Sequence, residues 1–245
     1  ITRDPRWGRV YETFGEDPYL TSEMGVAYIK GIQKDGKSLA CAKHFLAYGA
    51  SEAGLNMASA HIGKRELRDI YARPFEAVIN CGNLDVIMVT YVEIDGVPVS
   101  ISGEIVQELL REKMGYKGAV LCDGGSIDMC ATKQKVARDY KEAALLAIKA
   151  GLDADTPVSH CYVNLTEAVN EGLVDISFVN RSTRIILKQK FDLGLFENPF
   201  ADENKPSNVF STEKSVNISR KLAEESMILL KNDNDTLPLP QDAKT

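Results

Sequence analysis

The sequence lacks several features that would place it quickly in a class of proteins. It has no apolar run close to the ~20 residues that a membrane-spanning helix needs. Its three histidines and five cysteines show no C-x-x-C pair and no zinc-ligand spacing. No G-x-G-x-x-G turn is present. We therefore expect neither a membrane partner, nor a metal centre, nor a bound dinucleotide.

Basic residues are also too few for a nucleic-acid surface, which would show clustered lysine and arginine. Lys plus Arg is 29 against 35 for Asp plus Glu, giving a formal net charge of -6. This mild acidity favours a neutral or cationic ligand only weakly. Four of the five cysteines lie in or beside apolar runs, so we expect reduced thiols in the core; the five are Cys41, Cys81, Cys122, Cys130 and Cys161.

Between Ser38 and Gly151, short apolar runs alternate with longer amphipathic ones. Pro74 is expected to kink or break the first helix of this region. Ser102 is a candidate N-cap of the second helix and Gly115 its candidate C′ residue. The pattern predicts strands at 38–45, 84–91, 117–123 and 152–155, and helices at 65–82, 102–115 and 140–151.

Repeated strand–helix–strand units predict parallel strands joined by crossover helices. The runs AKHF, IMVTY and AVLCD carry polar residues at their C-terminal ends, where a (β/α) barrel holds its active site. The alternative is an open doubly wound sheet, which would normally bring a Gly-rich turn after its first strand. We expect an α/β fold that is the C-terminal part of a (β/α)8 TIM-type barrel.

Such a barrel usually takes ~250 residues, so we expect further units upstream of Ile1 and interpret both ends as cut. The missing N-terminus leaves localisation open. Downstream, helices are predicted at 164–172, with a capping box of Asn164 and Glu167, and at 175–191. Residues 197–212 have the composition of a linker. Residues 219–233 are predicted to run from helix into strand, as the opening of a second domain.

Several segments, taken in order, are similar to glycoside hydrolase family 3, most of all to its bacterial β-glucosidase and β-xylosidase branch. The resemblance covers nearly the whole chain. It implies domains at 1–196 (partial catalytic barrel) and 213–245 (beginning of a C-terminal α/β sandwich), with a linker at 197–212. The segments are RDPRWGRVYETFGEDPYL (3–20), AKHFLAYG (42–49), SEAGLNMASAHIGKREL (51–67), VIMVTYVEIDGVP (86–98), GAVLCD (118–123), KFDLGLFENPF (190–200) and AEESMILLKND (223–233).

By this resemblance Asp123 is the catalytic nucleophile. Retaining glycosidases need one carboxylate as nucleophile and a second as acid/base, ~5 Å apart. Asp123 ends a predicted strand, where a short carboxylate would point into the mouth of a barrel. The alternative is an aspartate that caps the following turn.

The same resemblance implies sugar contacts by Lys43 and His44. Adjacent residues of a strand face opposite ways, so both can reach one ligand only where the strand ends and bends. The alternatives are a surface lysine and a hydrogen-bonded core histidine.

Arg9, Tyr91 and Met88 complete the expected substrate-binding set. Arg9 offers a fork of several donors, and its alternative role is an ion pair with Glu12, Glu16 or Asp17. Tyr91 ends the predicted strand 84–91 and resembles the family's strand-end tyrosine; a role in packing is its equal alternative. Trp7, the single tryptophan, is expected to be packed and is left out of the site.

The sequence departs from the family pattern beside the nucleophile. Cys122 and Gly124 stand where the family usually has serine and an aromatic residue, which puts recognition of the aglycone in doubt. The family's acid/base usually lies in the second domain, beyond Thr245, and a sugar-contacting aspartate is expected upstream of Ile1. The N-acetylglucosaminidase branch is rejected because KHFLAYG lacks its proline and second histidine or arginine.

We therefore expect retaining hydrolysis of terminal β-glucosides or β-xylosides, with oligosaccharide or aryl and alkyl glycosides as substrates. No metal or organic cofactor is implied. These 245 residues alone are expected to be inactive, because the acid/base lies outside them. A homo-oligomer of the full-length protein is left open. The alternatives are a non-catalytic sugar-binding relative, and an unrelated phosphate-binding barrel enzyme, whose late Gly-rich loop is missing from 151–165.

Overall fold

The structure is a computed structural model that describes residues 1–203 and 210–242. The chain divides into two compact units, Ile1–Asn198 and Pro199–Thr245. The predicted linker at 197–212 includes residues 204–209, which lie outside the described residues.

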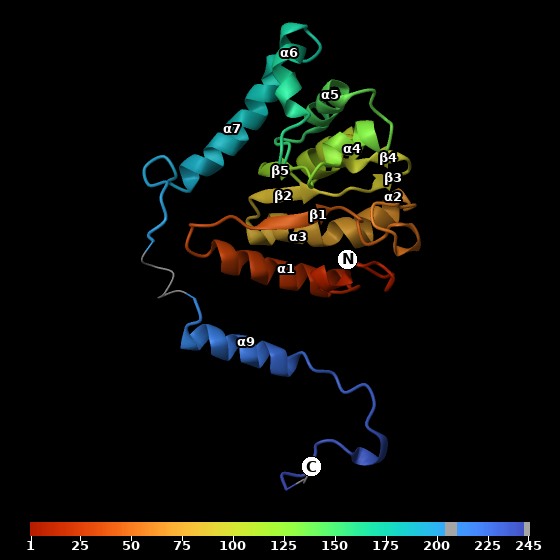
Figure 1. Cartoon of the computed structure of the whole chain (residues 1–245), viewed down its shortest axis with the longest axis vertical. Coiled ribbons are helices and arrows are strands. Elements are labelled where there is room, and N and C mark those ends of the chain that lie inside the picture. The colour runs from red at the N-terminus through yellow and green to blue at the C-terminus, as the bar shows by residue number, and fades with distance from the viewer. Residues whose placement is uncertain (204–209, 243–245) are drawn as a thin grey trace. The chain divides into compact units, whose positions relative to one another are not determined.

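The first unit alternates helices with short strands (Figure 1). Its strands are β1 (Cys41–Phe45), β2 (Val86–Val89), β3 (Glu93–Ile94), β4 (Val97–Pro98) and β5 (Ala119–Leu121). Its longer helices are α1 (Pro18–Gln33), α3 (Arg73–Gly82), η5 (Glu104–Lys113), α5 (Tyr140–Ala150) and α7 (Ile176–Asp192). The shorter ones are η1 (Val10–Glu12), η2 (Glu52–Gly54), α2 (Lys64–Glu66), η3 (Leu67–Ala72), η4 (Val99–Ile101), α4 (Ser126–Thr132), η6 (Tyr162–Asn164) and α6 (Leu165–Asn170).

Three of the strands form one parallel sheet in the order β1-β2-β5, which is also their order along the chain. Residues 152–155 extend this sheet beside β5 through a single bridge, Leu121 to Ala154. The predicted fourth strand is therefore reduced to one bridge. β3 and β4 pair as a small antiparallel hairpin that the sequence did not predict.

The two faces of the parallel sheet differ in burial. Ile87 and Val120 are neighbours in register on adjacent strands, and both are fully buried. On the opposite face Lys43 is exposed, and Met88 and Leu121 are partly exposed. The prediction of a buried first strand is therefore wrong for Cys41 and Lys43, because β1 is an edge strand with one uncovered face.

The boundaries of α3 and η5 follow local sequence signals. Pro74 lies at the start of α3, directly after the π-helical turn η3, so the expected break is confirmed. Its missing N–H cannot continue the regular helical ladder. The helix predicted at 102–115 runs over 104–113 as a π-helix, with the Ser102 hydroxyl accepting the Ile105 N–H (3.3 Å). Gly115 follows it with a φ of 68°, a conformation that favours glycine.

Other helix predictions need correction. Helix α1 was missed, although Asp17 caps it by accepting the Leu20 N–H (2.6 Å) and Pro18 stands at its first position; helix α4 was missed as well. The capping box of α6 is absent, because the Asn164 amide donates to the His160 and Cys161 carbonyls.

All five cysteines are free. Cys122, Cys130 and Cys161 are buried, as expected, but Cys41 and Cys81 are exposed. Cys41 lies on the uncovered edge strand and Cys81 near the end of α3, so the expectation of a core position is wrong for these two.

The second unit contains α9 (Glu213–Glu225), capped by Thr212, and the turn η7 (Asp233–Asp235). Met227, Ile228, Leu229 and Leu230 are exposed. They form no strand within the described part of the chain, so the predicted helix-to-strand passage is wrong in its second half. Within residues 1–203 and 210–242, no helix has the length and apolar character required to cross a bilayer.

Candidate active site

Asp123 lies two residues beyond β5, at the carboxyl end of the parallel sheet. Its side chain is only 13% exposed. The Oδ1 atom accepts the N–H of Gly124 at 2.8 Å, so the turn itself holds one carboxylate oxygen. The buried Oδ2 atom accepts no hydrogen bond from the described residues. The capping alternative thus accounts for one oxygen of Asp123 and leaves the other free.

His44 brings its imidazole to this free oxygen. Its Nε2 atom lies 3.3 Å from Asp123 Oδ2, and its side chain is 6% exposed. The register between β1 and β2 shifts at this point: Lys43 pairs with Met88 and Phe45 with Val89, leaving His44 as an extra residue. Such a bulge bends the strand and redirects a side chain. Adjacent Lys43 and His44 can reach one ligand only where the strand bends, and this bulge provides such a bend.

Burial lowers the pKa of His44 to about 4, and the nearby Arg9 and Lys43 charges act in the same direction. The Asp123 and Glu12 carboxylates oppose this shift. His44 is therefore neutral near pH 7, with one ring nitrogen as donor and the other as acceptor. A neutral imidazole of this kind suits a hydroxyl group, which both donates and accepts.

Glu12 joins two cations at the rim of the site. Arg9 forms a two-pronged ion pair with it, through Nε to Oε1 at 2.6 Å and Nη2 to Oε2 at 2.7 Å. Lys43 Nζ lies 3.5 Å from Glu12 Oε2. These hydrogen bonds lower the pKa of Glu12 to about 2. The ion pair considered for Arg9 is thus formed, and Arg9 Nη2 also lies 3.4 Å from His44 Nε2.

Tyr91 reaches the same turn from the end of β2. Its hydroxyl donates to the Gly124 carbonyl at 2.9 Å, next to the nucleophile candidate. Burial and the Asp123 charge raise the pKa of Tyr91, so its phenol stays protonated. A Cβ atom built at Gly124 would meet Pro157 Cδ at 3.5 Å and the Tyr91 hydroxyl at 3.6 Å. These are ordinary contacts, so a Cβ atom would fit beside Asp123.

The remaining candidates lie around this centre. Met88 is in register with Lys43 on one side and Leu121 on the other, which places it on the uncovered face of the sheet. Trp7 is 4% exposed, as expected for a packed tryptophan. It nevertheless lines a small pocket together with Glu12, Lys43, His44 and Tyr48.

Two residues of this cluster were not among the predicted site residues. Glu12 was considered only as an ion-pair partner for Arg9, yet it contacts Lys43 as well. Tyr48 places its ring 5.0 Å from the His44 ring and 5.1 Å from the Arg9 guanidinium carbon. Both lie inside the segments that carried the family resemblance, which was the available signal.

A hollow of about 560 Å³ lies elsewhere. It is lined by residues 153–155 together with α6 and α7, and mostly by apolar atoms. Its buried carboxylate Asp153 is fully engaged by Arg111, Val120 and Ser182. Both oxygens of Asp153 therefore have partners, unlike Oδ2 of Asp123.

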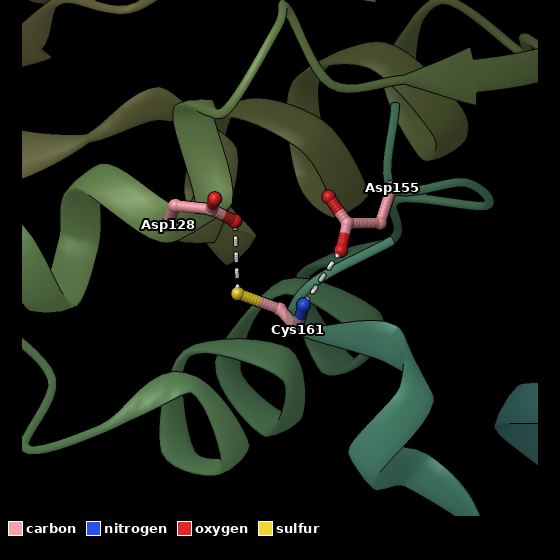
Figure 2. A group of neighbouring side chains, drawn as sticks. All are labelled: Asp128, Asp155 and Cys161. Carbon is pink, nitrogen blue, oxygen red and sulfur yellow. Dashed lines mark hydrogen bonds between the residues drawn. The ribbon is translucent and has the colours of Figure 1, made fainter. Parts of the chain in front are cut away.

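A group with metal-ligand chemistry lies beside the loop after residue 155: Asp128, Asp155 and Cys161 (Figure 2). The Cys161 thiol donates to Asp128 Oδ1 at 3.2 Å, and the Cys161 N–H donates to Asp155 Oδ2 at 2.9 Å. His160 Nδ1 lies 2.7 Å from Asp128 Oδ2. Burial and the Asp128 carboxylate raise the pKa of Cys161, so the thiol is protonated and donates in this contact. We assign this group to a hydrogen-bonded network that ties α4 to the loop.

Comparison with known proteins identifies a family whose sequence pattern this chain matches. Residues 1–188 match the Glycosyl hydrolase family 3 N terminal domain. A β-xylosidase of Formosa agariphila is 32% identical, over 96% of this chain and 35% of its own length. A periplasmic β-glucosidase of Salmonella typhimurium is 34% identical, over 98% of this chain and 32% of its own length.

A solved structure is also similar to this chain. The β-glucosidase from Listeria innocua in complex with isofagomine superposes with a TM-score of 0.94 at 34% identity, covering 100% of this chain and 35% of that one. The chain thus spans about a third of the length of the relatives it matches.

Proposed function

This chain belongs to glycosyl hydrolase family 3, and from that membership we propose that its protein is a retaining glycosidase that cleaves terminal β-glucosides or β-xylosides. Both sugars are proposed because the relatives bear both names, β-xylosidase and β-glucosidase. The proposed substrates are oligosaccharides and aryl or alkyl glycosides.

The free Oδ2 atom of Asp123 is the observation that carries the proposal. A nucleophilic carboxylate needs one oxygen that is held in place and another whose lone pair is available to the anomeric carbon. The Gly124 N–H supplies the first condition, and the unengaged Oδ2 supplies the second. Attack by Oδ2 forms a glycosyl–enzyme ester and releases the aglycone, and water then hydrolyses that ester.

The groups around Asp123 suit a sugar ring. Neutral His44 can exchange hydrogen bonds with a hydroxyl, and Lys43 and Arg9 can donate charge-assisted ones. Glu12 holds both cations, at 2.6 Å for Arg9 and 3.5 Å for Lys43, and offers acceptor lone pairs of its own. Met88 and Tyr91 would add apolar surface and restrict the position of the ring.

Neither Glu12 nor His44 suits the acid/base role. Glu12 has a pKa of about 2, so it is ionised at neutral pH and has no proton to give. His44 is neutral and lies 3.3 Å from the nucleophile, closer than the ~5 Å between the two carboxyl groups of a retaining enzyme. We therefore propose that the acid/base lies outside these 245 residues.

A direct consequence is that the 245-residue chain by itself is inactive or nearly so. General acid assistance contributes ~10²–10⁴-fold to such reactions. Turnover of an aryl β-glucoside and an aryl β-xyloside by this chain should be compared with turnover by the longest native form of the protein that carries these residues. Equal rates would contradict the proposal.

We propose a partial TIM-type barrel for residues 1–196, joined through 197–212 to the beginning of an α/β sandwich domain at 213–245. The sequential strand order supports the barrel, because a doubly wound sheet reverses its order at a switch point. Right-handed crossovers that all step in one direction put their helices on one face. The uncovered face with Lys43, Met88 and Leu121 would then line the barrel interior.

A non-catalytic sugar-binding protein is the second candidate, suggested by Gly124 beside Asp123. A mechanism-based fluoro-sugar separates the two possibilities. Label on the peptide that contains GAVLCDGG, found by mass spectrometry after proteolysis of the longest native form, is the expected result. Sugar binding without any label would support the non-catalytic candidate. Label on another carboxylate would remove Asp123 from the role.

A further inference from the structure

Tyr48 lies at the centre of the cluster around Asp123. Its ring centroid is 5.0 Å from that of His44, 5.1 Å from that of Trp7 and 5.8 Å from that of Tyr91, each in an edge-to-face arrangement. The Arg9 guanidinium lies over the same ring, at 5.1 Å from its centroid. Tyr48 is 3% exposed, so the ring is nearly closed off from solvent.

The ring is held from two directions. Its hydroxyl donates to Asn56 Oδ1 at 2.6 Å, which fixes the outer end of the side chain. On the backbone side, Gly49 bridges to Thr2. A Cβ atom at Gly49 would meet the Ile1 carbonyl oxygen at 2.7 Å, so only glycine allows this approach. The N-terminal segment that carries Trp7 and Arg9 is thereby brought against the segment that carries His44 and Tyr48.

We propose that Tyr48 is a positioning residue whose ring orients the Arg9 guanidinium and the His44 imidazole toward Asp123. The ring face attracts the Arg9 cation through its π electrons. The edge-to-face contact restricts rotation of the imidazole. Tyr48 acts through these two residues and is not a catalytic residue itself. This role rests on the proposed glycosidase function for its kinetic consequences, but its structural consequences can be measured independently.

The structural consequence appears at His44. The charged groups that face this imidazole are Asp123, Arg9, Lys43 and Glu12. Burial is the main cause of its low pKa, about 4, and the Tyr48 ring provides part of that burial. A smaller side chain at position 48 admits water to the imidazole. The pKa of His44 then rises toward its ordinary value of ~6.5.

The test is an NMR titration of the His44 imidazole signal, identified by its loss in a His44→Gln variant. In the longest native form, we expect Tyr48→Phe to titrate like the parent at His44, because the ring remains. Tyr48→Leu should raise the His44 midpoint by about one pH unit or more, since desolvation can shift a pKa by several units. Tyr48→Met, which fills volume without a ring face, should behave like Tyr48→Leu and serves if the leucine variant does not fold.

Tyr116 provides a matched control at the opposite end of β5. It is 3% exposed, and its hydroxyl donates one hydrogen bond, to the Ala119 carbonyl at 3.1 Å. Tyr116→Leu should lower stability and leave the His44 titration unchanged. Kinetics give a second readout: Tyr48→Leu should reduce kcat/KM by about 10-fold or more and Tyr48→Phe by about 2-fold or less, in line with the loss of one or two oriented contacts.

An unchanged His44 midpoint in both Tyr48→Leu and Tyr48→Met would overturn the proposal and leave Tyr48 as core packing. So would a midpoint that rises equally in Tyr116→Leu. Failure of the glycosidase function would look different. The parent would then turn over no glycoside, while Tyr48→Leu and Tyr48→Met would still raise the His44 midpoint.

Discussion

The two ends of β5 carry buried charged groups that are satisfied to different degrees. At the amino end, Arg111 binds Asp153 at 2.6 Å and also donates to the carbonyls of Gly151 and Gly118. Asp153 in turn accepts the Val120 N–H and the Ser182 hydroxyl. At the carboxyl end, Asp123 keeps one buried oxygen without a hydrogen bond.

On this difference we base the proposal that the Arg111 network stabilises the fold and that the Asp123 cluster binds a ligand. Burying a polar atom without a partner costs free energy, and a ligand that bonds to it would recover that cost. The Arg111 network completes its hydrogen bonds within the protein. The Asp123 cluster leaves bonding capacity for a ligand. The predictions below use substitutions at each end to break or sharpen this comparison.

The largest effect is expected at Asp123. Asp123→Asn should lower kcat of the longest native form by several orders of magnitude with little change in KM, because a nucleophile contributes in the transition state alone. The amide can still accept the Gly124 N–H, so the melting temperature should stay near that of the parent. Steady-state kinetics and a thermal melt, measured on one preparation, check both halves. An active Asp123→Asn variant would show that Oδ2 of Asp123 is not the nucleophile.

At the amino end of β5, Arg111→Met should lower the free energy of unfolding and leave kcat and KM unchanged. Removing one partner of a buried ion pair leaves an uncompensated charge and costs about 3–5 kcal/mol, here at Asp153. Denaturant unfolding measures the loss. Arg138→Met is the control, since Arg138 pairs with Glu142 on the surface and should change stability little. An unchanged free energy of unfolding in Arg111→Met would show that the network contributes nothing to stability.

An effect of intermediate size is expected on the pH dependence of stability. The pKa of His44 is about 4 in the folded protein against ~6.5 when unfolded. The unfolded state therefore binds more protons between these values, and the free energy of unfolding falls as pH drops from about 6.5 to about 4. His44→Gln should flatten this part of the curve, whereas His61→Gln, at an exposed position, should not. Parallel curves for parent and His44→Gln would contradict the prediction.

The smallest effect is expected from the loss of sugar hydrogen bonds. His44→Ala should change kcat and KM each by moderate factors, because a hydrogen bond contributes about 1 kcal/mol. Kinetics on an aryl glycoside measure the change, with His61→Ala as the control. A loss as large as that of Asp123→Asn would mean that His44 takes part in the chemistry.

Much of this architecture follows from local pattern in the sequence. The three parallel strands, Ser102 and Gly115 at the ends of η5, and the break at Pro74 depend on neighbouring residues, whose preferences a sequence displays directly. The missed helix α1 had its signal too, in Asp17 followed by Pro18. The exposed thiols of Cys41 and Cys81 could not be predicted, because exposure depends on which face of an element the fold covers.

The sequence by itself also singled out Asp123, Arg9, Lys43, His44 and Tyr91, through the motifs that resemble a known family. Only the tertiary structure decided how these residues meet. The bulge at His44, the Glu12 carboxylate shared by two cations, and the Tyr48 ring between Arg9 and His44 all join segments that are far apart in the chain. Hydrogen bonding of a carboxylate is likewise decided by the fold: one oxygen of Asp123 has no partner, whereas both oxygens of Asp153 have partners.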